Sequence, residues 1–228
     1  MYSDEQSLDD VGRSCKSRAE ADKHFFGGRF RTDGMNVGEG DDLWMRHAVY
    51  FPTGFCFGYG DKSGDGWGAT KWMRIEFDNG NPSTGGPGNR LTLELGNFAH
   101  AACNDSTEIW GAAREYAGNA NCKPSTQASL GTDAWHFVQW HVHMAADDSG
   151  FIRFWLDDKY LGQWDGQTLP SDKPKIAFIQ YGDYWNGSPF QTVEWYVDDI
   201  IMTQQAPDTL DAEGHPFISP AARVKDWD

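Results

Sequence analysis

Residues 176–203 read IAFIQYGDYWNGSPFQTVEWYVDDIIMT, and this stretch decides the fold class. Its first part, 176–181, is apolar and then turns polar. Its second part, 193–203, alternates and is rich in β-branched and aromatic residues. Both patterns are typical of β-strands. We therefore predict two antiparallel strands that form a hairpin, with an aromatic loop between them.

That loop combines aromatic and amide side chains. Tyr184, Trp185 and Asn186 follow the first strand, where a packed core has no need of large aromatic residues. A sugar ring binds to a flat apolar face and to hydrogen-bond partners in its own plane. The loop is therefore predicted to contact a carbohydrate. The alternative is a loop that packs on its own aromatic side chains.

Composition favours one all-β domain. The chain has 228 residues with eleven Trp and 26 Gly, which suits strands joined by glycine turns better than helices. All-β sandwiches often reach this length undivided. We predict an N-terminal polar arm at 1–22, a sandwich domain at 23–204 and a C-terminal surface tail at 205–228. Residues 17–23 are expected to form a short helix before the domain proper.

The net charge of −15 limits the possible partners. Without a Lys/Arg cluster the chain is not expected to bind nucleic acid or an anionic membrane surface. It has no run of about 20 apolar residues that would span a membrane. An acidic polysaccharide remains the predicted partner, because a local group of Arg and Lys can oppose the overall charge.

The opening residues MYSDEQSLDDVGR are polar and acidic, unlike a secretory signal peptide. The chain is therefore predicted to be extracellular in a mature form, or to be virion-associated and part of a virion or cell-surface assembly.

Further segments alternate between apolar and polar residues, at 43–51, 91–95 and along DAWHFVQWHVHMAAD, and a second hairpin is expected at 151–156 and 159–164. Eight or more antiparallel strands without long helices predict a two-sheet antiparallel β-sandwich of the jelly-roll type. The polar strand faces supply candidates for a concave binding face: Arg46, Arg74, Glu76, Gln139, His141, His143, Gln180 and Tyr184. Their convergence on one face is a hypothesis, because strand register does not follow from one sequence.

Several candidates have a plainer interpretation. Arg74 either binds a ligand or pairs with Glu76 or Glu94 on the face of a sheet. His141 and His143 share one strand face at positions i and i+2, where they would frame a base or hold a metal, or else lie on a solvated face.

The four cysteines form no CxxC pair, so no zinc site is expected. Cys103 and Cys122 bracket a Gly/Asn/Ala-rich loop, and we predict a disulfide that contributes about 3 kcal/mol. For Cys15 and Cys56 both a disulfide and two separate thiols remain open. No metal or cofactor is predicted.

The order of six segments is similar to a known group of proteins. The segments are DDLWMRHAVYFPTGF, TKWMRIEF, WHFVQWHVHM, FWLDDKYLGQWDG, FIQYGDYWNG and VEWYVDDIIMT. Over roughly residues 24–218 they resemble the concanavalin A-like jelly-roll polysaccharide lyases, especially the heparin-lyase-I-like and alginate-lyase-like proteins. The resemblance implies that fold, but most of it is framework that non-catalytic lectin-like domains share.

Two segments of the resemblance concern activity. QYGDY resembles the Lys-Ala-Gly-Asn-Tyr motif of alginate lyases, whose tyrosine is the proton donor and often the base. This implies that role for Tyr184, with Gln180 at the position of the lysine. KWMRIEF resembles a Gln-Ile-His strand, which places Arg74 at the glutamine and Glu76 at the histidine.

Loss of that histidine removes the usual neutral base. The resemblance then implies that Tyr184 serves alone or uses His141 or His143. The implied reaction is β-elimination in a uronate polymer, in which cations or amides neutralise the sugar carboxylate. The predicted catalytic residues are Tyr184, Arg74, His141 and His143, and the predicted substrate contacts are Arg46, Lys71, Glu76, Gln139, Gln180, Trp185 and Asn186.

Two other functions remain open on the same fold. One is a non-catalytic carbohydrate-binding or virion adhesion module. The other is a glycoside hydrolase, which needs two carboxylates about 5 to 9 Å apart, a pair that Glu76 and Glu94 would have to supply. The glucanase-type strand signature is absent from the sequence, which disfavours the hydrolase.

Overall fold

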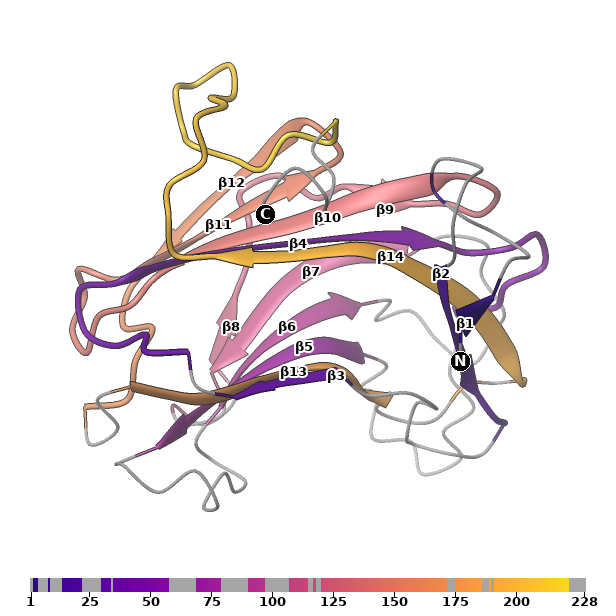
Figure 1. The fold of residues 1–228 in the computed structure, drawn as a ribbon, viewed down its shortest axis with the longest axis horizontal. Helices are drawn as coiled ribbons and strands as arrows, with labels where there is room; N and C mark the ends of the chain where they lie inside the picture. Colours follow the sequence, from indigo (N-terminus) through magenta and orange to yellow (C-terminus); the bar gives the residue numbers. More distant parts are fainter. Residues whose placement is uncertain are drawn as a thin grey trace.

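The chain folds, in a computed structural model, into two antiparallel sheets that lie face to face (Figure 1). Among the described residues no helix is long and apolar enough to cross a membrane. In several strands the backbone is described but some side chains are not. The described residues are 2–3, 8, 14–21, 30–33, 35–57, 69–78, 90–96, 107–114, 117, 120–171, 175–185, 189 and 191–221.

Sheet A holds the strands in the order β1-β2-β14-β4-β10-β11-β12. Their bounds are β1 Tyr2–Ser3, β2 Ser14–Ala19, β4 Asp42–Tyr50, β10 Trp135–His143, β11 Phe151–Leu156, β12 Lys159–Asp165 and β14 Val193–Thr203. Sheet B has the order β3-β13-β5-β6-β7-β8, and β9 pairs with β7. Its bounds are β3 Phe30–Asp33, β5 Ala69–Asp78, β6 Arg90–Gly96, β7 Thr107–Arg114, β8 Ala120–Cys122, β9 Ser129–Leu130 and β13 Lys175–Trp185. The predicted jelly-roll sandwich is confirmed.

Alternate side chains of each strand fill the space between the sheets, because side chains in a strand point to opposite faces in turn. On β5 the buried residues are Met73, Ile75 and Phe77, and facing β10 contributes Val138 and Trp140, all fully buried. The face of each sheet that points away from the other sheet is called its outer face below.

The predicted hairpin at 176–203 is wrong. β13 belongs to sheet B and β14 to sheet A, so the chain crosses between the sheets after β13. β13 also continues to Trp185, which places Tyr184 in a strand rather than in a loop. Alternation shows that a strand has one buried face, but it does not show which strand is its neighbour.

The predicted helix at 17–23 is also wrong in its first residues. Ser14–Ala19 is strand β2, which pairs with β14 through Ala19 opposite Val193 and Cys15 opposite Val197. Ser17 is buried in this strand. The polar composition suggested an exposed arm, but the backbone pairing places these residues in sheet A.

The predicted Cys103–Cys122 disulfide does not form. Cys122 keeps its thiol and is fully buried on the short strand β8, opposite Ala112 of β7. Cys15 also keeps its thiol, whereas Cys56 is disulfide-bonded. The Cys15–Cys56 pair is therefore excluded as well. Cys103 itself lies outside the described residues.

The segment after β14 runs over the outer face of sheet A, seen in yellow in Figure 1. The carboxylate of Asp211 accepts hydrogen bonds from Trp155 Nε1 at 2.9 Å and from the backbone N–H of His215 and Glu213. Burial alone would raise the pKa of Asp211, but these donors hold it below its usual value. Phe217 is buried, so the segment is packed against the sheet.

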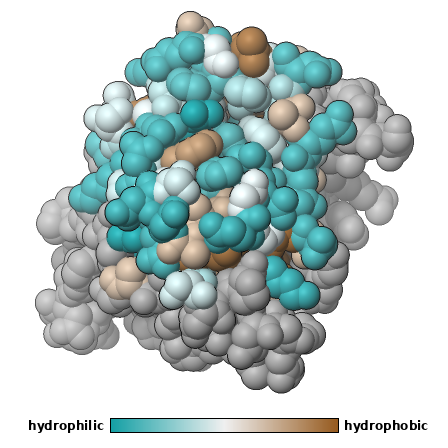
Figure 2. Space-filling model, turned by 90° about the vertical axis from the view of Figure 1, so that its left-hand side faces the viewer, coloured by the Kyte–Doolittle hydropathy of each residue, from teal (hydrophilic) through white to brown (hydrophobic). Residues whose placement is uncertain are grey.

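Among the residues that Figure 2 colours by hydropathy, hydrophilic ones predominate on the side shown. Among the described residues Leu210, on the segment after β14, is the exposed large hydrophobic one. The predominance of hydrophilic residues agrees with the net charge of −15.

One histidine lies in the core between the sheets. His47 of β4 is fully buried, stacks on Trp140 with ring centres 5.5 Å apart, and meets the ring of Tyr181 of β13 edge-on at 5.1 Å. Burial, and then the charge of Arg46, lower the pKa of His47 to about 3. It is therefore neutral at pH 7.

Gly162 of β12 has no room for a side chain. A Cβ there would lie 2.7 Å from the backbone nitrogen of Ser125, and the residue has φ +124. We expect Gly162→Ala to lower the free energy of unfolding by about 2 kcal/mol, through overpacking and backbone strain. Urea denaturation measures this. Gly131→Ala is the control, since nothing lies within 4 Å of its Cβ, and an equal loss there would contradict the prediction.

Candidate active site

The outer face of sheet B carries a row of polar side chains across three adjacent strands. Gln180 of β13 lies opposite Arg74 of β5, which lies opposite Thr92 of β6. The alternation of each strand explains this row, because the neighbours of these residues along the chain, such as Ile75 and Leu93, are buried in the core. An arginine, an amide and a hydroxyl thus share one line.

The next row contains a carboxylate between two arginines. Glu76 lies opposite Phe178 on one side and Arg90 on the other. Its Oε1 is 3.4 Å from Nη1 of Arg74 and 2.5 Å from Nε of Arg90. Only 2% of the Glu76 side chain is exposed, against 12% for Arg74 and 17% for Arg90. The ion pair of Arg74 with Glu76 that the sequence left open does form.

Two irregularities in strand pairing coincide beside these rows. β13 shifts register against β5 between Tyr181 and Tyr184, and β5 shifts against β6 between Lys71 and Met73. As a result Tyr184 lies opposite Lys71. Such bulges are frequent next to active sites, where they change which face a residue occupies. The side chains of Tyr184, Trp185 and Lys71, and the whole of Asn186, lie outside the described residues.

Arg46 and Gln139 lie on the outer face of sheet A, under the segment after β14. Arg46 Nη1 donates to the carbonyl oxygen of Ser219 at 2.5 Å, and Arg46 Nη2 is 3.7 Å from Oδ2 of Asp199. The guanidinium lies over the ring of Phe137. Gln139 Oε1 accepts from the backbone N–H of Ile218 at 3.0 Å. Both side chains are buried and hold the tail, so the prediction that they bind substrate is wrong.

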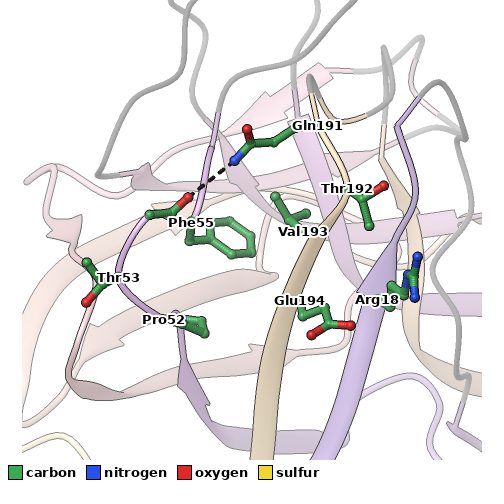
Figure 3. Close-up of a pocket in the computed structure, with 9 residues that line it drawn as sticks. Arg18, Pro52, Thr53, Phe55, Gln191, Thr192, Val193 and Glu194 are labelled. Atoms are coloured by element: carbon green, nitrogen blue, oxygen red, sulfur yellow. Dashed lines mark hydrogen bonds between the residues drawn. The ribbon is translucent and has the colours of Figure 1, made fainter.

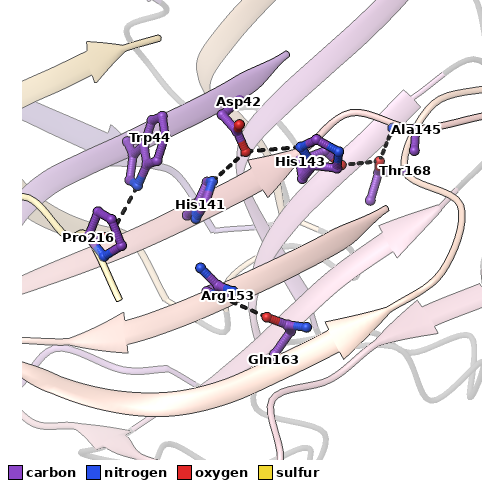
Figure 4. Close-up of polar contacts among 9 residues, drawn as sticks. All are labelled: Asp42, Trp44, His141, His143, Ala145, Arg153, Gln163, Thr168 and Pro216. Carbon is purple, nitrogen blue, oxygen red and sulfur yellow. Dashed lines mark hydrogen bonds and ion pairs between the residues drawn. The ribbon is translucent and has the colours of Figure 1, made fainter. Parts of the chain in front are cut away.

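His141 and His143 share the carboxylate of Asp42 on the same outer face (Figure 4). Oδ1 of Asp42 is 2.7 Å from Nε2 of His141 and 3.1 Å from Nδ1 of His143. His141 stacks on Trp44 at 4.1 Å, and Trp44 Nε1 donates to the carbonyl oxygen of Pro216. Through Trp44, this histidine pair therefore contacts the segment after β14 that covers sheet A.

Burial lowers the pKa of His141, although Asp42 opposes the shift. His141 is thus neutral at pH 7 and takes part in a hydrogen bond rather than an ion pair. Burial would raise the pKa of Asp42, but its hydrogen bonds with His141 and His143 lower the pKa overall. No group of His, Cys, Asp and Glu among the described residues is arranged to hold a metal ion.

The predicted candidates therefore do not converge on one face. Arg74, Glu76 and Gln180 belong to the outer face of sheet B, whereas Arg46, Gln139, His141 and His143 belong to that of sheet A, with the core between them. The sequence prediction grouped them because each lies on the polar face of its own strand. Strand alternation does not distinguish the two outer faces.

Some site residues were missed. Arg90 and Thr92 complete the rows of sheet B, and both alternate with the buried Leu91 and Leu93, so the pattern of RLTLELG contained the signal. Asp42 was missed because an aspartate that begins a strand resembles a solvated turn residue.

A separate pocket of about 310 Å³ lies at an end of sheet A (Figure 3). It is lined by Arg18 of β2, by the turn from Pro52 to Phe55 and by residues 191–194. Its polar groups are already engaged: Gln191 Nε2 donates to Gly54 O, and Glu194 pairs with Lys16 at 3.0 Å. The pocket shares no residue with the rows of sheet B.

Solved structures with a similar fold include an endo-β-1,4-glucuronan lyase from the fungus Trichoderma reesei, with TM-score 0.54 and 11% identity over 85% of this chain and 82% of that one. Alginate lyase vAL-1 from Chlorella virus has TM-score 0.54 and 12% identity over 88% of each chain. The alginate lyase of Aplysia kurodai has TM-score 0.52 and 12% identity over 90% of this chain and 86% of that one. At such identities the likeness establishes the fold alone.

No curated protein matches the sequence significantly. A family model described as "Polysaccharide lyase" does match, over residues 3–201. This match runs from the first strand of sheet A into β14 and includes the polar rows of sheet B. Because it covers most of the sequence, the chain belongs to the polysaccharide lyase family.

Proposed function

We propose that this protein cleaves a uronate-containing anionic polysaccharide by β-elimination on the outer face of sheet B. The observation that carries the proposal is the row of Gln180, Arg74 and Thr92 beside the register position shared by Tyr184 and Lys71. Family membership supports lyase chemistry. Structures of similar fold include a glucuronan lyase and alginate lyases, which supports a uronate polymer as substrate.

Arg74 and Gln180 are proposed to bind the carboxylate of the sugar that loses its proton. A guanidinium matches a carboxylate with two parallel N–H donors, and an amide adds a third. Removing the proton next to the carboxylate pushes negative charge onto its oxygens. Donors fixed in advance at that place lower the barrier, because they need no reorganisation during the reaction.

Tyr184 is proposed to transfer the protons of this reaction, as base and as acid. A base takes the proton from the carbon next to the carboxylate, the electrons of that C–H bond form a C=C bond, and the C4–O bond breaks. The departing oxygen then takes a proton from an acid. Tyr184 serves as this acid and also as the base. A tyrosine titrates near 10 in water, so a basic tyrosine at neutral pH needs cations close by, such as Lys71 and Arg74.

The histidines of sheet A do not fit this reaction. His141 and His143 are on the opposite outer face from Arg74, so neither is within reach of a polymer bound on sheet B. We further propose that the protein acts outside the cell or as part of a virion, where such polymers are met.

A direct test uses purified protein with alginate, glucuronan and heparin-type polymers. Elimination creates a C=C bond conjugated with the carboxylate, so ultraviolet absorbance is expected to rise with at least one uronate polymer. Boiled protein is the control. Polymer binding without any rise in absorbance would instead indicate a carbohydrate-binding module and would overturn the proposed reaction.

A further inference from the structure

We propose that Glu76 is a positioning residue that holds the guanidinium groups of Arg74 and Arg90 in place for a substrate carboxylate. The inference rests on the proposed function, because that carboxylate belongs to the uronate polymer. It assigns to this chain a pair of arginines, joined by one acid, where the related motif has a single neutral histidine.

The contacts show one oxygen fixing two cations. Oε1 of Glu76 is within 3.4 Å of Arg74 Nη1 and 2.5 Å of Arg90 Nε, and the register places Glu76 and Arg90 directly opposite each other. Arginine side chains carry about 2 kcal/mol of rotamer entropy. A nearly buried carboxylate that orients both of them removes that cost before the polymer binds.

The same contacts argue against Glu76 as the base. Its Oε1 accepts a hydrogen bond from Arg74 and forms an ion pair with Arg90, and taking a proton from a sugar would weaken both contacts at once. A pure stability role is also a poor account. Arg74 and Glu76 on β5 and Arg90 on the adjacent β6 together carry a net positive charge, and Gln180 lies opposite Arg74. A local positive charge suits an anionic ligand.

The test distinguishes the length of the side chain at position 76 from its charge. Glu76→Asp keeps the charge but shortens the side chain, so one oxygen no longer reaches both guanidinium groups. We expect its dissociation constant for polyglucuronate or alginate, measured by affinity electrophoresis, to rise about tenfold, in line with a charged hydrogen bond. Arg90→Ala is expected to weaken binding to a similar degree. Adding Glu76→Asp to Arg90→Ala is expected to cost less than Glu76→Asp alone, because only the contact with Arg74 is then left to lose.

Turnover provides the second readout. For both Glu76→Asp and Glu76→Gln we expect kcat to fall about tenfold, because Arg74 also stabilises the transition state and is then held less firmly. The pH profile is expected to stay unchanged, because neither variant removes a group that transfers protons. A loss of kcat of about 100-fold together with the acidic limb of the profile would make Glu76 the base and overturn the proposal.

Glu194→Asp is the matched control, since it shortens a strand carboxylate that pairs with Lys16 on sheet A. It is expected to bind polymer like wild type. Wild-type binding by Glu76→Asp with only a lower melting temperature would reduce Glu76 to a structural role and overturn the inference.

The two proposals fail separately. Wild-type protein that binds a uronate polymer without cleaving it overturns the proposed reaction, yet the binding comparison still decides the role of Glu76. Wild-type protein that binds none of the polymers overturns both.

Discussion

Tyr184→Phe is expected to reduce turnover of a uronate polymer by about 100-fold or more, the usual size of a general acid–base contribution. The change removes one hydroxyl and keeps the ring. Polymer binding is therefore expected to stay within about threefold of wild type, as for a group needed mainly in the transition state. The register position of Tyr184, opposite Lys71 at two coinciding bulges, is the structural reason for choosing it.

Rates from ultraviolet absorbance and affinity electrophoresis with the same polymer measure the two effects. Tyr160→Phe is the control, because Tyr160 lies on β12 of sheet A, against Trp155 and His215. It is expected to behave like wild type. A Tyr184→Phe protein with wild-type kcat would show that another residue transfers the protons.

Acid is expected to destabilise the fold through His47. Its pKa is about 3 in the folded state, against 6.5 in water, so the unfolded chain binds the proton more readily. The contribution of neutral His47 to the free energy of unfolding is complete above pH 6.5 and is lost as pH falls toward 3. At pH 4.5 the loss amounts to about 3 kcal/mol, at 1.36 kcal/mol per unit. The pKa of His47 is low because its side chain lies in the interior, between Trp140 and Tyr181.

His47→Leu removes the titrating group at nearly constant volume. Urea denaturation at pH 7.5 and 4.5 is expected to show a drop for wild type that exceeds the drop for His47→Leu by about 3 kcal/mol. Met45→Leu changes the same buried strand without a titrating group, so it is expected to keep the wild-type pH dependence. Equal pH dependence in His47→Leu and wild type would show that His47 does not control it.

Much of the sandwich was predictable, because its strands are amphipathic. The hairpin of β11 and β12 and the inward direction of Met73, Ile75 and Phe77 follow from alternation and turn residues alone. Strand partners did not follow. The pairing of β2 with β14 joins residues some 180 positions apart, and only the three-dimensional fold decides it.

The candidate site was predictable in part for the same reason. Arg74, Glu76 and Gln180 were found from the polar side of two strands and from motif resemblance, and the structure places them together. Arg46 and Gln139 satisfied the same criterion but are covered by residues 218–219, a contact that no local pattern encodes. The disulfide prediction failed because loop composition does not show which thiols enter the core.

The pairing of β2 with β14 also bears on the order in which the protein forms. Ala19 is synthesised about 170 residues before its partner Val193. The outer face of sheet A is covered later still, when Ile218 and Ser219 have been synthesised. Sheet A therefore cannot be completed before β14 has been synthesised, because β2 pairs with β14. Until those residues are made, the aromatic strands of sheet A lack part of their cover, and exposed apolar surface of this kind is prone to aggregation.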